Sequence, residues 1–150
     1  MNAWDEFAAW AAALGAPLSP AQIAQFAAYE ALLLAWNERI ALTAIREPHQ
    51  IRIRHFLDAL SCAAATGPLD GQRLIDIGSG AGFPGLPLKI LYPDLRLTLV
   101  DSVAKKARFL ETVAAELGLS DVIVIADRAE ALGQAAGHRE SYDWAAARAV

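Results

Sequence analysis

A glycine-rich segment with an acidic residue in front of it is the part of the sequence best suited to chemistry. It reads Asp76-Ile77-Gly78-Ser79-Gly80-Ala81-Gly82-Phe83-Pro84-Gly85 and follows a short apolar run. Because glycine has no side chain, Gly78, Gly80 and Gly82 let the backbone approach a ligand closely. The N–H groups at the start of a following helix can bind polar ligand atoms. The segment therefore predicts a binding loop for a nucleotide-like ligand.

The spacing of the glycines distinguishes this loop from the dinucleotide-binding fingerprint. That fingerprint needs its third glycine at position 83, where the sequence has Phe83. Gly-x-Gly-x-Gly with Asp76 two residues before it is similar instead to motif I of class I methyltransferases. By that resemblance, the Asp76 carboxylate lies near the methionine ammonium group of S-adenosylmethionine, directly or through water.

Further polar residues follow where two more strands are expected to end. Asp101 comes about twenty residues after the loop, where a carboxylate can accept hydrogen bonds from ribose hydroxyls. After the next strand, backbone groups near Ala129 and Glu130 are placed to contact an adenine edge. The plainer interpretation is a tight turn, a helix cap at Asp101 and a solvated Glu130. The combination of the glycine-rich loop, Asp101 and the Ala129-Glu130 segment favours a cofactor site over this plainer interpretation.

The residues available near this site limit which atom could receive a methyl group. Exocyclic base amines usually require an Asn/Asp-Pro-Pro-aromatic segment after the fourth strand, where this chain has only alanines, Arg148 and Val150. Pyrimidine C5 requires a cysteine nucleophile, but Cys62 lies on an apolar helix and is expected to be packed. An intrinsically nucleophilic ring nitrogen or oxygen, such as purine N7, stays open because it mainly needs positioning. Arg148 is a candidate to hold substrate or cofactor, or else a surface arginine.

The second half of the chain has the pattern of the sheet that these residues need. The expected strands and helices alternate along the chain: strand Arg73–Ile77, helix Pro84–Leu91, strand Leu95–Val100, helix Lys105–Leu117, strand Val122–Ala126 and a fourth strand from about Tyr142 through Ala147. This order requires parallel strands with right-handed crossovers. We expect a Rossmann-like α/β cofactor-binding domain over residues 71–150, with the C-terminal strands of the sheet missing from this chain.

The first half of the chain is helical. Alanine- and leucine-rich stretches with apolar residues at helical spacing predict helices over Asn2–Leu14, Pro20–Glu38 and Pro48–Thr66. A turn cluster over residues 15–20 follows the first of these helices, and a second cluster over residues 67–71 divides the helical part from the rest of the chain. We expect residues 1–70 to form an N-terminal helical cap.

Composition narrows the class of protein. The 150 residues are 55% hydrophobic, enough for one substantial core, and the net charge is −4. The single cysteine excludes an internal disulfide and a multi-cysteine zinc site. The acidic N-terminus is unlike a secretory signal, and the apolar run Ala27–Trp36 is too short to span a membrane. We expect a cytoplasmic, monomeric protein with no metal and no membrane partner, whose contacts to any nucleic acid are confined to a local basic patch.

From Trp36 to Val150 the chain resembles the RsmG (GidB) family of bacterial small-subunit ribosomal RNA guanine-N7 methyltransferases. The matching segments are Trp36-Asn37, Leu42-Thr43, Arg54-His55-Phe56-Leu57-Asp58, the loop from Asp76 to Pro87, Asp101-Ser102, Lys105-Lys106, Arg108-Phe109-Leu110 and Arg148-Ala149. The double proline of Phe83-Pro84-Gly85-Leu86-Pro87 is far more specific than the glycines alone.

The resemblance implies a class I fold, S-adenosylmethionine as cofactor and ribosomal RNA, within the small subunit, as partner. It implies that the cofactor is contacted by Gly78, Phe83, Ala129, Glu130 and Arg148 and that Asp101 binds its ribose. The basic residues Arg54, Lys105, Lys106 and Arg108 would bind RNA phosphate; without the resemblance they would be solvated surface charges, with Arg54 paired to Asp58. His55 and Asp58 would border the substrate and are, with Arg148, the catalytic candidates, although a lone histidine is more often structural.

Three functions are consistent with the sequence. The first is methylation of N7 of a guanine in 16S ribosomal RNA. The second keeps the cofactor but has a small metabolite as substrate, which the acidic net charge permits. The third is a nucleotide-binding or assembly module without catalysis, since a fold does not determine a function.

Overall fold

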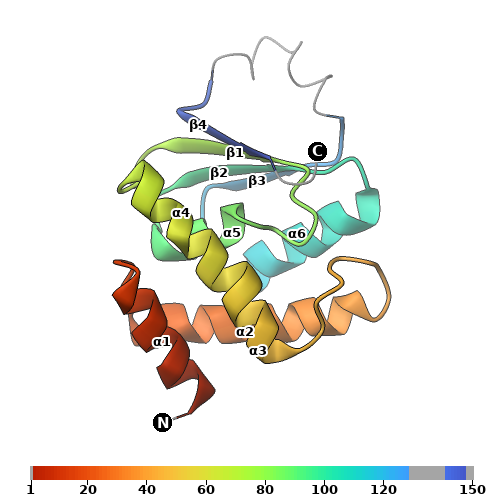
Figure 1. Ribbon diagram of the computed structural model, residues 1–150. Helices are drawn as coiled ribbons and strands as arrows, with labels where there is room; N and C mark the ends of the chain where they lie inside the picture. The colour runs from red at the N-terminus through yellow and green to blue at the C-terminus, as the bar shows by residue number, and fades with distance from the viewer. Residues whose placement is uncertain (1, 129–140, 148–150) are drawn as a thin grey trace.

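The computed structural model describes residues 2–128 and 141–147, which form a parallel sheet with helices beneath one face (Figure 1). The strands are β1 (Arg73–Ile77), β2 (Arg96–Val100), β3 (Val122–Ile125) and β4 (Trp144–Ala147). The helices are α1 (Ala3–Ala13), α2 (Pro20–Asn37), α3 (Pro48–Ile51), the π-helical turn η1 (Arg52–Leu57), α4 (Asp58–Thr66), α5 (Gly85–Leu91) and α6 (Ala104–Glu116).

The sheet has the order β3-β2-β1-β4, and every neighbouring pair is parallel. Helix α5 connects β1 to β2, and α6 connects β2 to β3. The chain then returns to the other side of β1 to form β4, so the direction of winding reverses next to β1. Ligands of open α/β sheets bind at such a reversal, outside the carboxyl ends of the strands. The predicted α/β fold is confirmed.

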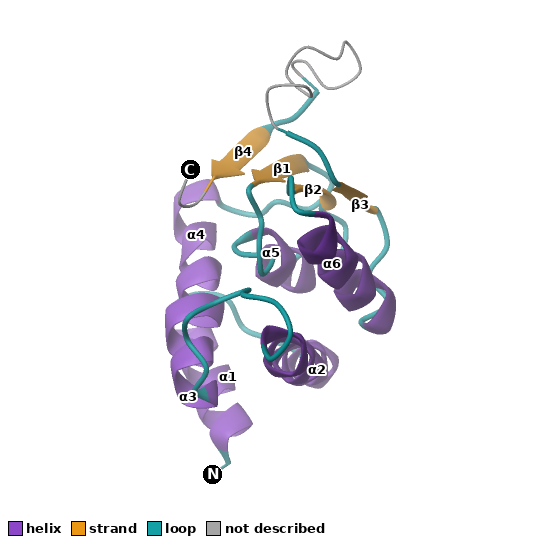
Figure 2. Ribbon diagram, turned by 90° about the vertical axis from the view of Figure 1, so that its right-hand side faces the viewer, coloured by secondary structure: helices purple, strands orange, loops and turns teal. Residues whose placement is uncertain are grey.

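Alternation along the strands separates the two faces of the sheet. Leu74, Leu97 and Leu99 join the main core on the side of the helices, whereas Ile75 and Val100 form a small cluster on the opposite face. This is the two-residue period expected of a strand. In Figure 2, α5 and α6 lie directly against the sheet, and α2 lies beneath them.

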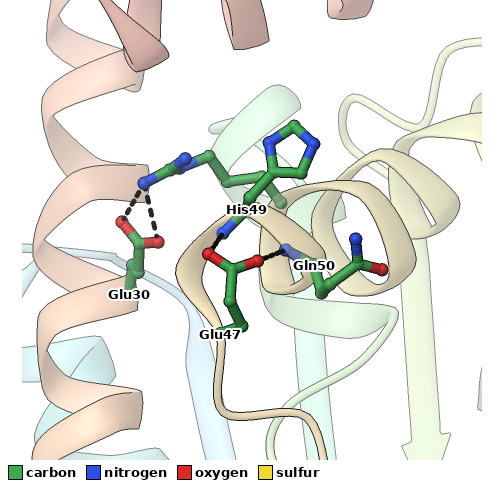
Figure 3. A network of polar contacts seen from close by, with 5 residues as sticks. Glu30, Glu47, His49 and Gln50 are labelled. Carbon is green, nitrogen blue, oxygen red and sulfur yellow. Dashed lines mark hydrogen bonds and ion pairs between the residues drawn. The ribbon is translucent and has the colours of Figure 1, made fainter.

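The cap consists of α1, α2 and one long helix over residues 48–66. Ser19 caps α2, since its Oγ accepts from Gln22 N at 3.2 Å and Gln22 Oε1 accepts from Ser19 N at 2.7 Å. Glu47 caps α3 by accepting the backbone N–H groups of His49 and Gln50, each at 3.0 Å (Figure 3). All predicted elements are confirmed to within about two residues, but the long helix contains the π-helical turn η1, which regular helical spacing did not predict.

Aromatic side chains join the cap to the sheet domain. Phe7, Phe26, Tyr29 and Phe56 of the cap are each 0% exposed, and Phe83 of the glycine-rich loop belongs to the same cluster. Their ring centroids lie between 5.1 and 6.2 Å apart, the usual range of aromatic contacts. One continuous core therefore runs from the cap to the binding loop.

Two kinds of feature are absent from the part of the chain that the structure describes. None of its helices has the length and apolar character that crossing a membrane requires. Across residues 2–128 and 141–147, His, Cys, Asp and Glu side chains do not gather in groups of three or more that could bind a metal ion.

Candidate functional site

An open depression of about 340 Å³ lies at the carboxyl ends of the first three strands. Its walls come from the last residues of β1 and β2 and from residues that follow β1, β2 and β3: Ile77, Gly78, Val100, Asp101, Ser102, Asp127 and Arg128. A larger hollow of about 380 Å³ lies towards the opposite ends of the strands, lined by residues such as Arg96 and Tyr142. We assign the site to the first depression because ligands of parallel α/β sheets bind at the carboxyl ends.

Asp101 is held at the edge of this depression by two backbone N–H groups. Its Oδ2 accepts from Gly80 N and its Oδ1 from Val103 N, both at 2.9 Å, and the residue is 7% exposed. Each carboxylate oxygen can accept a second hydrogen bond. The carboxylate is thus fixed in position and suited to receive ligand hydroxyls.

The alternative role for Asp101 as a helix cap is wrong. Helix α6 begins at Ala104, its capping position is Val103, and no side chain provides a cap there. Asp101 instead accepts the N–H two residues along the chain, as in an Asx-turn. Asp101 therefore binds the glycine-rich loop and lines the depression, and it does not cap α6.

The glycine-rich loop bends over the end of β2. Gly78 N and Ser79 N donate to the Val100 carbonyl at 2.9 and 3.0 Å, and Gly82 N donates to Ser79 O at 2.7 Å. Gly78, Gly80 and Gly82 have φ angles of 69°, 55° and 98°. Residues other than glycine rarely adopt this backbone conformation. A Cβ on Gly80 would meet only the Gly78 carbonyl, at 4.0 Å. The space beside Gly80 is therefore open.

Asp76 lies beneath the loop rather than on the surface of the depression. It is 0% exposed, and its Oδ2 accepts from Gly85 N at 2.8 Å. A Cβ on Gly85 would come within 2.8 Å of this oxygen and 2.9 Å of Leu99 Cδ2. Asp76 thus fixes the start of α5, and its contact with a cofactor stays a prediction.

Tyr29 of the cap contacts the loop from the core side. Its hydroxyl donates to the Ala81 carbonyl at 2.5 Å, and its ring lies 5.8 Å from that of Phe83. Burial raises the pKa of Tyr29 well above its ordinary value, and the nearby Asp76 charge raises it further. The tyrosine is therefore a neutral donor. The sequence pattern did not predict Tyr29 as a site residue, because it lies within an apolar helix. The one signal that could have identified it is that a buried tyrosine hydroxyl needs a hydrogen-bond partner.

His55 also reaches the loop. Its ring stacks on that of Phe83, with centroids 4.3 Å apart and an angle of 12° between the planes. Its Nε2 is 2.8 Å from Thr43 Oγ1. Asp58, the other catalytic candidate of this helix, is exposed. Catalytic roles for both stay predictions.

The predicted RNA-binding residues lie on two helices. Lys105 and Arg108 are exposed and Lys106 is half-buried on α6, which begins three residues after Asp101. Arg54 is exposed on η1. Three predicted cofactor residues, Ala129, Glu130 and Arg148, lie outside the described residues. Cys62 is half-buried and packs against the core, in agreement with a structural cysteine.

Comparison with known proteins gives a consistent result. Residues 22–150 match the family model described as GidB, rRNA small subunit methyltransferase G. Proteins named Ribosomal RNA small subunit methyltransferase G are 55% identical over 97% of the chain in Roseiflexus castenholzii, 48% over 91% in Alkaliphilus metalliredigens and 42% over 97% in Listeria monocytogenes. The chain spans 57–62% of the length of these relatives. The parallel sheet, the loop and this similarity together lead to one conclusion: the chain belongs to the GidB family.

Proposed function

We propose that this chain is the cofactor-binding part of an S-adenosylmethionine-dependent methyltransferase that methylates N7 of a guanine in 16S ribosomal RNA, within the small ribosomal subunit. Membership of the GidB family and the names of the relatives support this function. The observation that carries it is the Asp101 carboxylate, fixed by Gly80 N and Val103 N beside the depression at the strand ends. We place the protein in the cytoplasm, where its RNA substrate would be, and propose that it acts as a monomer.

The residues at the depression fit the proposed cofactor. Asp101 would accept hydrogen bonds from the ribose hydroxyls, since both of its oxygens keep acceptor capacity. The backbone at Gly78 and Gly80 would face the methionine part, because the side of Gly80 that a Cβ would occupy is open. Ala129, Glu130 and Arg148 are assigned to the cofactor by family resemblance alone. When bound, S-adenosylmethionine supplies a methyl group on a sulfonium sulfur.

For such a transfer the residues of this chain would mainly bind and orient. Guanine N7 carries a lone pair and no proton, so no side chain is needed as a general base, and positioning provides most of the catalysis. Lys105, Lys106, Arg108 and Arg54 would bind RNA phosphates around the site. Because the net charge is −4, these contacts must be local rather than a property of the whole surface.

Titration of the complete protein with S-adenosylmethionine and S-adenosylhomocysteine tests the cofactor assignment. We expect binding of both, strong loss of affinity in Asp101→Ala, and unchanged affinity in Asp94→Ala. Asp94 is an exposed carboxylate before the opposite end of β2, which makes it a matched control. Preference for NAD, or no binding at all, would contradict the proposal.

Incubation of the complete protein with small ribosomal subunits and methyl-labelled cofactor tests the substrate. We expect the label on N7 of a guanine in the RNA. Label on a small molecule instead would support a metabolite methyltransferase, and binding of the cofactor without transfer would support a module without catalysis.

A further inference from the structure

The bulky side chain of the glycine-rich loop is enclosed by rings from the cap. Phe83 follows Gly82 and is 5% exposed. His55 stacks in parallel on it at 4.3 Å, while Tyr29 and Phe56 contact it at 5.8 and 5.9 Å. Tyr29 and Phe56 are fully buried core residues, whereas His55 is half-buried and polar. His55 therefore needs an explanation other than core packing.

The imidazole of His55 is fixed in orientation by a chain of hydrogen bonds. Its Nε2 lies 2.8 Å from Thr43 Oγ1, which also accepts from Ile45 N at 3.1 Å. The backbone of Thr43 is bound on both sides by Asn37: Thr43 N donates to Asn37 Oδ1 at 3.0 Å, and Asn37 Nδ2 donates to Thr43 O at 2.9 Å. Asn37 is the last residue of α2 and is 5% exposed. The ring on Phe83 is thus anchored to a helix of the cap.

The π-helical turn η1 presents two consecutive residues to Phe83. Neighbours on an α-helix point about 100° apart, yet both His55 and Phe56 contact this ring. Turns of this kind occur frequently at functional sites. The local helix geometry therefore agrees with a role for His55 at the loop.

We propose that His55 is a positioning residue, which keeps the glycine-rich loop in its binding conformation by holding Phe83. The inference rests on the proposed function, in which this loop binds S-adenosylmethionine. His55 does not line the depression beside Asp101. Methylation of N7 also needs no general base. Its effect passes through Phe83 to the backbone of the loop, not to the reacting atoms.

Three substitutions distinguish the contribution of the His55 ring from that of its hydrogen bond. His55→Ala removes both, His55→Gln keeps a polar group without an aromatic ring, and His55→Phe keeps the ring alone. We expect S-adenosylmethionine to bind about 3- to 10-fold more weakly to the Ala and Gln variants, the size expected for loss of one aromatic pair. The Phe variant should recover most of the affinity.

Steady-state kinetics distinguish positioning from catalysis. We expect the Ala variant to raise KM for the cofactor with kcat nearly unchanged at saturation, and the Phe variant to behave as the unaltered protein. A Phe variant with normal KM and strongly reduced kcat would make His55 a catalytic residue and overturn the proposal.

His49→Ala is the matched control, because His49 lies on the same long helix but contacts Trp10 rather than the loop, with ring centroids 5.8 Å apart. We expect normal cofactor affinity in this variant. Equal weakening in both alanine variants, or none in His55→Ala, would contradict a specific role for His55.

Hydrogen exchange without ligand tests the loop directly. The amides of Gly80 and Gly82 are hydrogen-bonded within the site. Exchange of a peptide covering residues 78–84 should be faster in His55→Ala and unchanged in His49→Ala. If the unaltered protein did not bind S-adenosylmethionine, the proposed function would fail, and this exchange would still decide whether His55 orders the loop.

Discussion

At the scale of single residues, the site separates groups that face a ligand from groups that build the loop. Asp101 stands at the depression, whereas Asp76 is buried beneath the loop and binds Gly85 N. The glycines divide in the same way: space is open beside Gly80, while Gly85 packs against Asp76 and Leu99. Residues that look equivalent in the motif therefore have different physical roles.

Alanine substitutions at Gly80 and Gly85 should both lower stability, but only the substitution at Gly80 should act mainly on cofactor binding. Gly85→Ala places a methyl group against closely packed atoms and should lower the free energy of unfolding by roughly 1–3 kcal/mol. Gly80→Ala meets no such obstacle, and its positive φ should cost about 1–2 kcal/mol. Its methyl group should instead weaken S-adenosylmethionine binding strongly. Urea unfolding measures the free energy of unfolding, and calorimetry measures the affinity for S-adenosylmethionine. Normal affinity in Gly80→Ala would contradict a close approach of the ligand to the backbone at Gly80.

At the scale of elements, a partly buried ion pair joins helices of the cap. Arg52 Nη2 of η1 lies 3.1 and 3.4 Å from the two carboxylate oxygens of Glu30 on α2, and its guanidinium lies over the Trp4 ring of α1 at 4.8 Å. Burial raises the pKa of Glu30, and the Arg52 charge offsets part of that rise. Glu47, exposed at the start of α3, has a lowered pKa, chiefly because it accepts the His49 backbone N–H.

These two carboxylates should give stability opposite pH dependences. A raised pKa means that Glu30 binds its proton more tightly in the folded state. Its favourable contribution is complete below the ordinary value of 4.5 and is lost as pH rises through the folded pKa. The free energy of unfolding of the unaltered protein minus that of Glu30→Gln should therefore fall as pH rises above 4.5.

Glu47→Gln is the matched control, because the sign reverses when the folded pKa is lowered. The contribution of Glu47 is present above 4.5 and is lost as pH falls through its folded pKa, so the corresponding difference should rise with pH. Urea unfolding between about pH 3 and 8 measures stability on both sides of the ordinary pKa of a carboxyl group. Differences of the same sign for the two variants would contradict the assigned shifts.

At the scale of the whole molecule, the cap and the sheet share a core. The main cluster contains Phe7 of α1 and Leu97 of β2, with Phe56 and Phe83 between the two halves. We propose that residues 1–70 are a cap and residues 71–150 a cofactor-binding domain which nevertheless unfold as one cooperative unit.

Phe56→Ala tests this cooperativity. The ring is 0% exposed, so its removal should cost about 3–5 kcal/mol of unfolding free energy. We expect hydrogen exchange to accelerate by the same factor in the slowest amides of α2 and of β1. Acceleration confined to the cap would show that the two parts unfold separately.

The charge of the whole molecule also differs from the charge near the site. The net charge is −4, but basic residues of α6 follow Asp101 in the chain. Lys105→Ala should make the plot of log affinity for RNA against log salt concentration shallower by about 0.7–0.9, the value for one lost phosphate contact. Arg96→Ala, at the opposite end of β2, should leave the slope unchanged. An unchanged slope in the Lys105 variant would remove it from the RNA-binding surface.

Sequence patterns alone predict the succession of strands and helices along the chain, the glycine loop after β1 and the carboxylate at the end of β2. Those features depend on local periodicity, turn residues and the rule that parallel strands end at the same edge. The three-dimensional structure was needed to show that Tyr29 binds Ala81, that His55 stacks on Phe83 and that Asp76 is buried. These contacts join residues far apart in the sequence, 52 positions for Tyr29 and Ala81, and so depend on how the cap packs against the sheet. Local sequence patterns do not predict how the cap packs against the sheet.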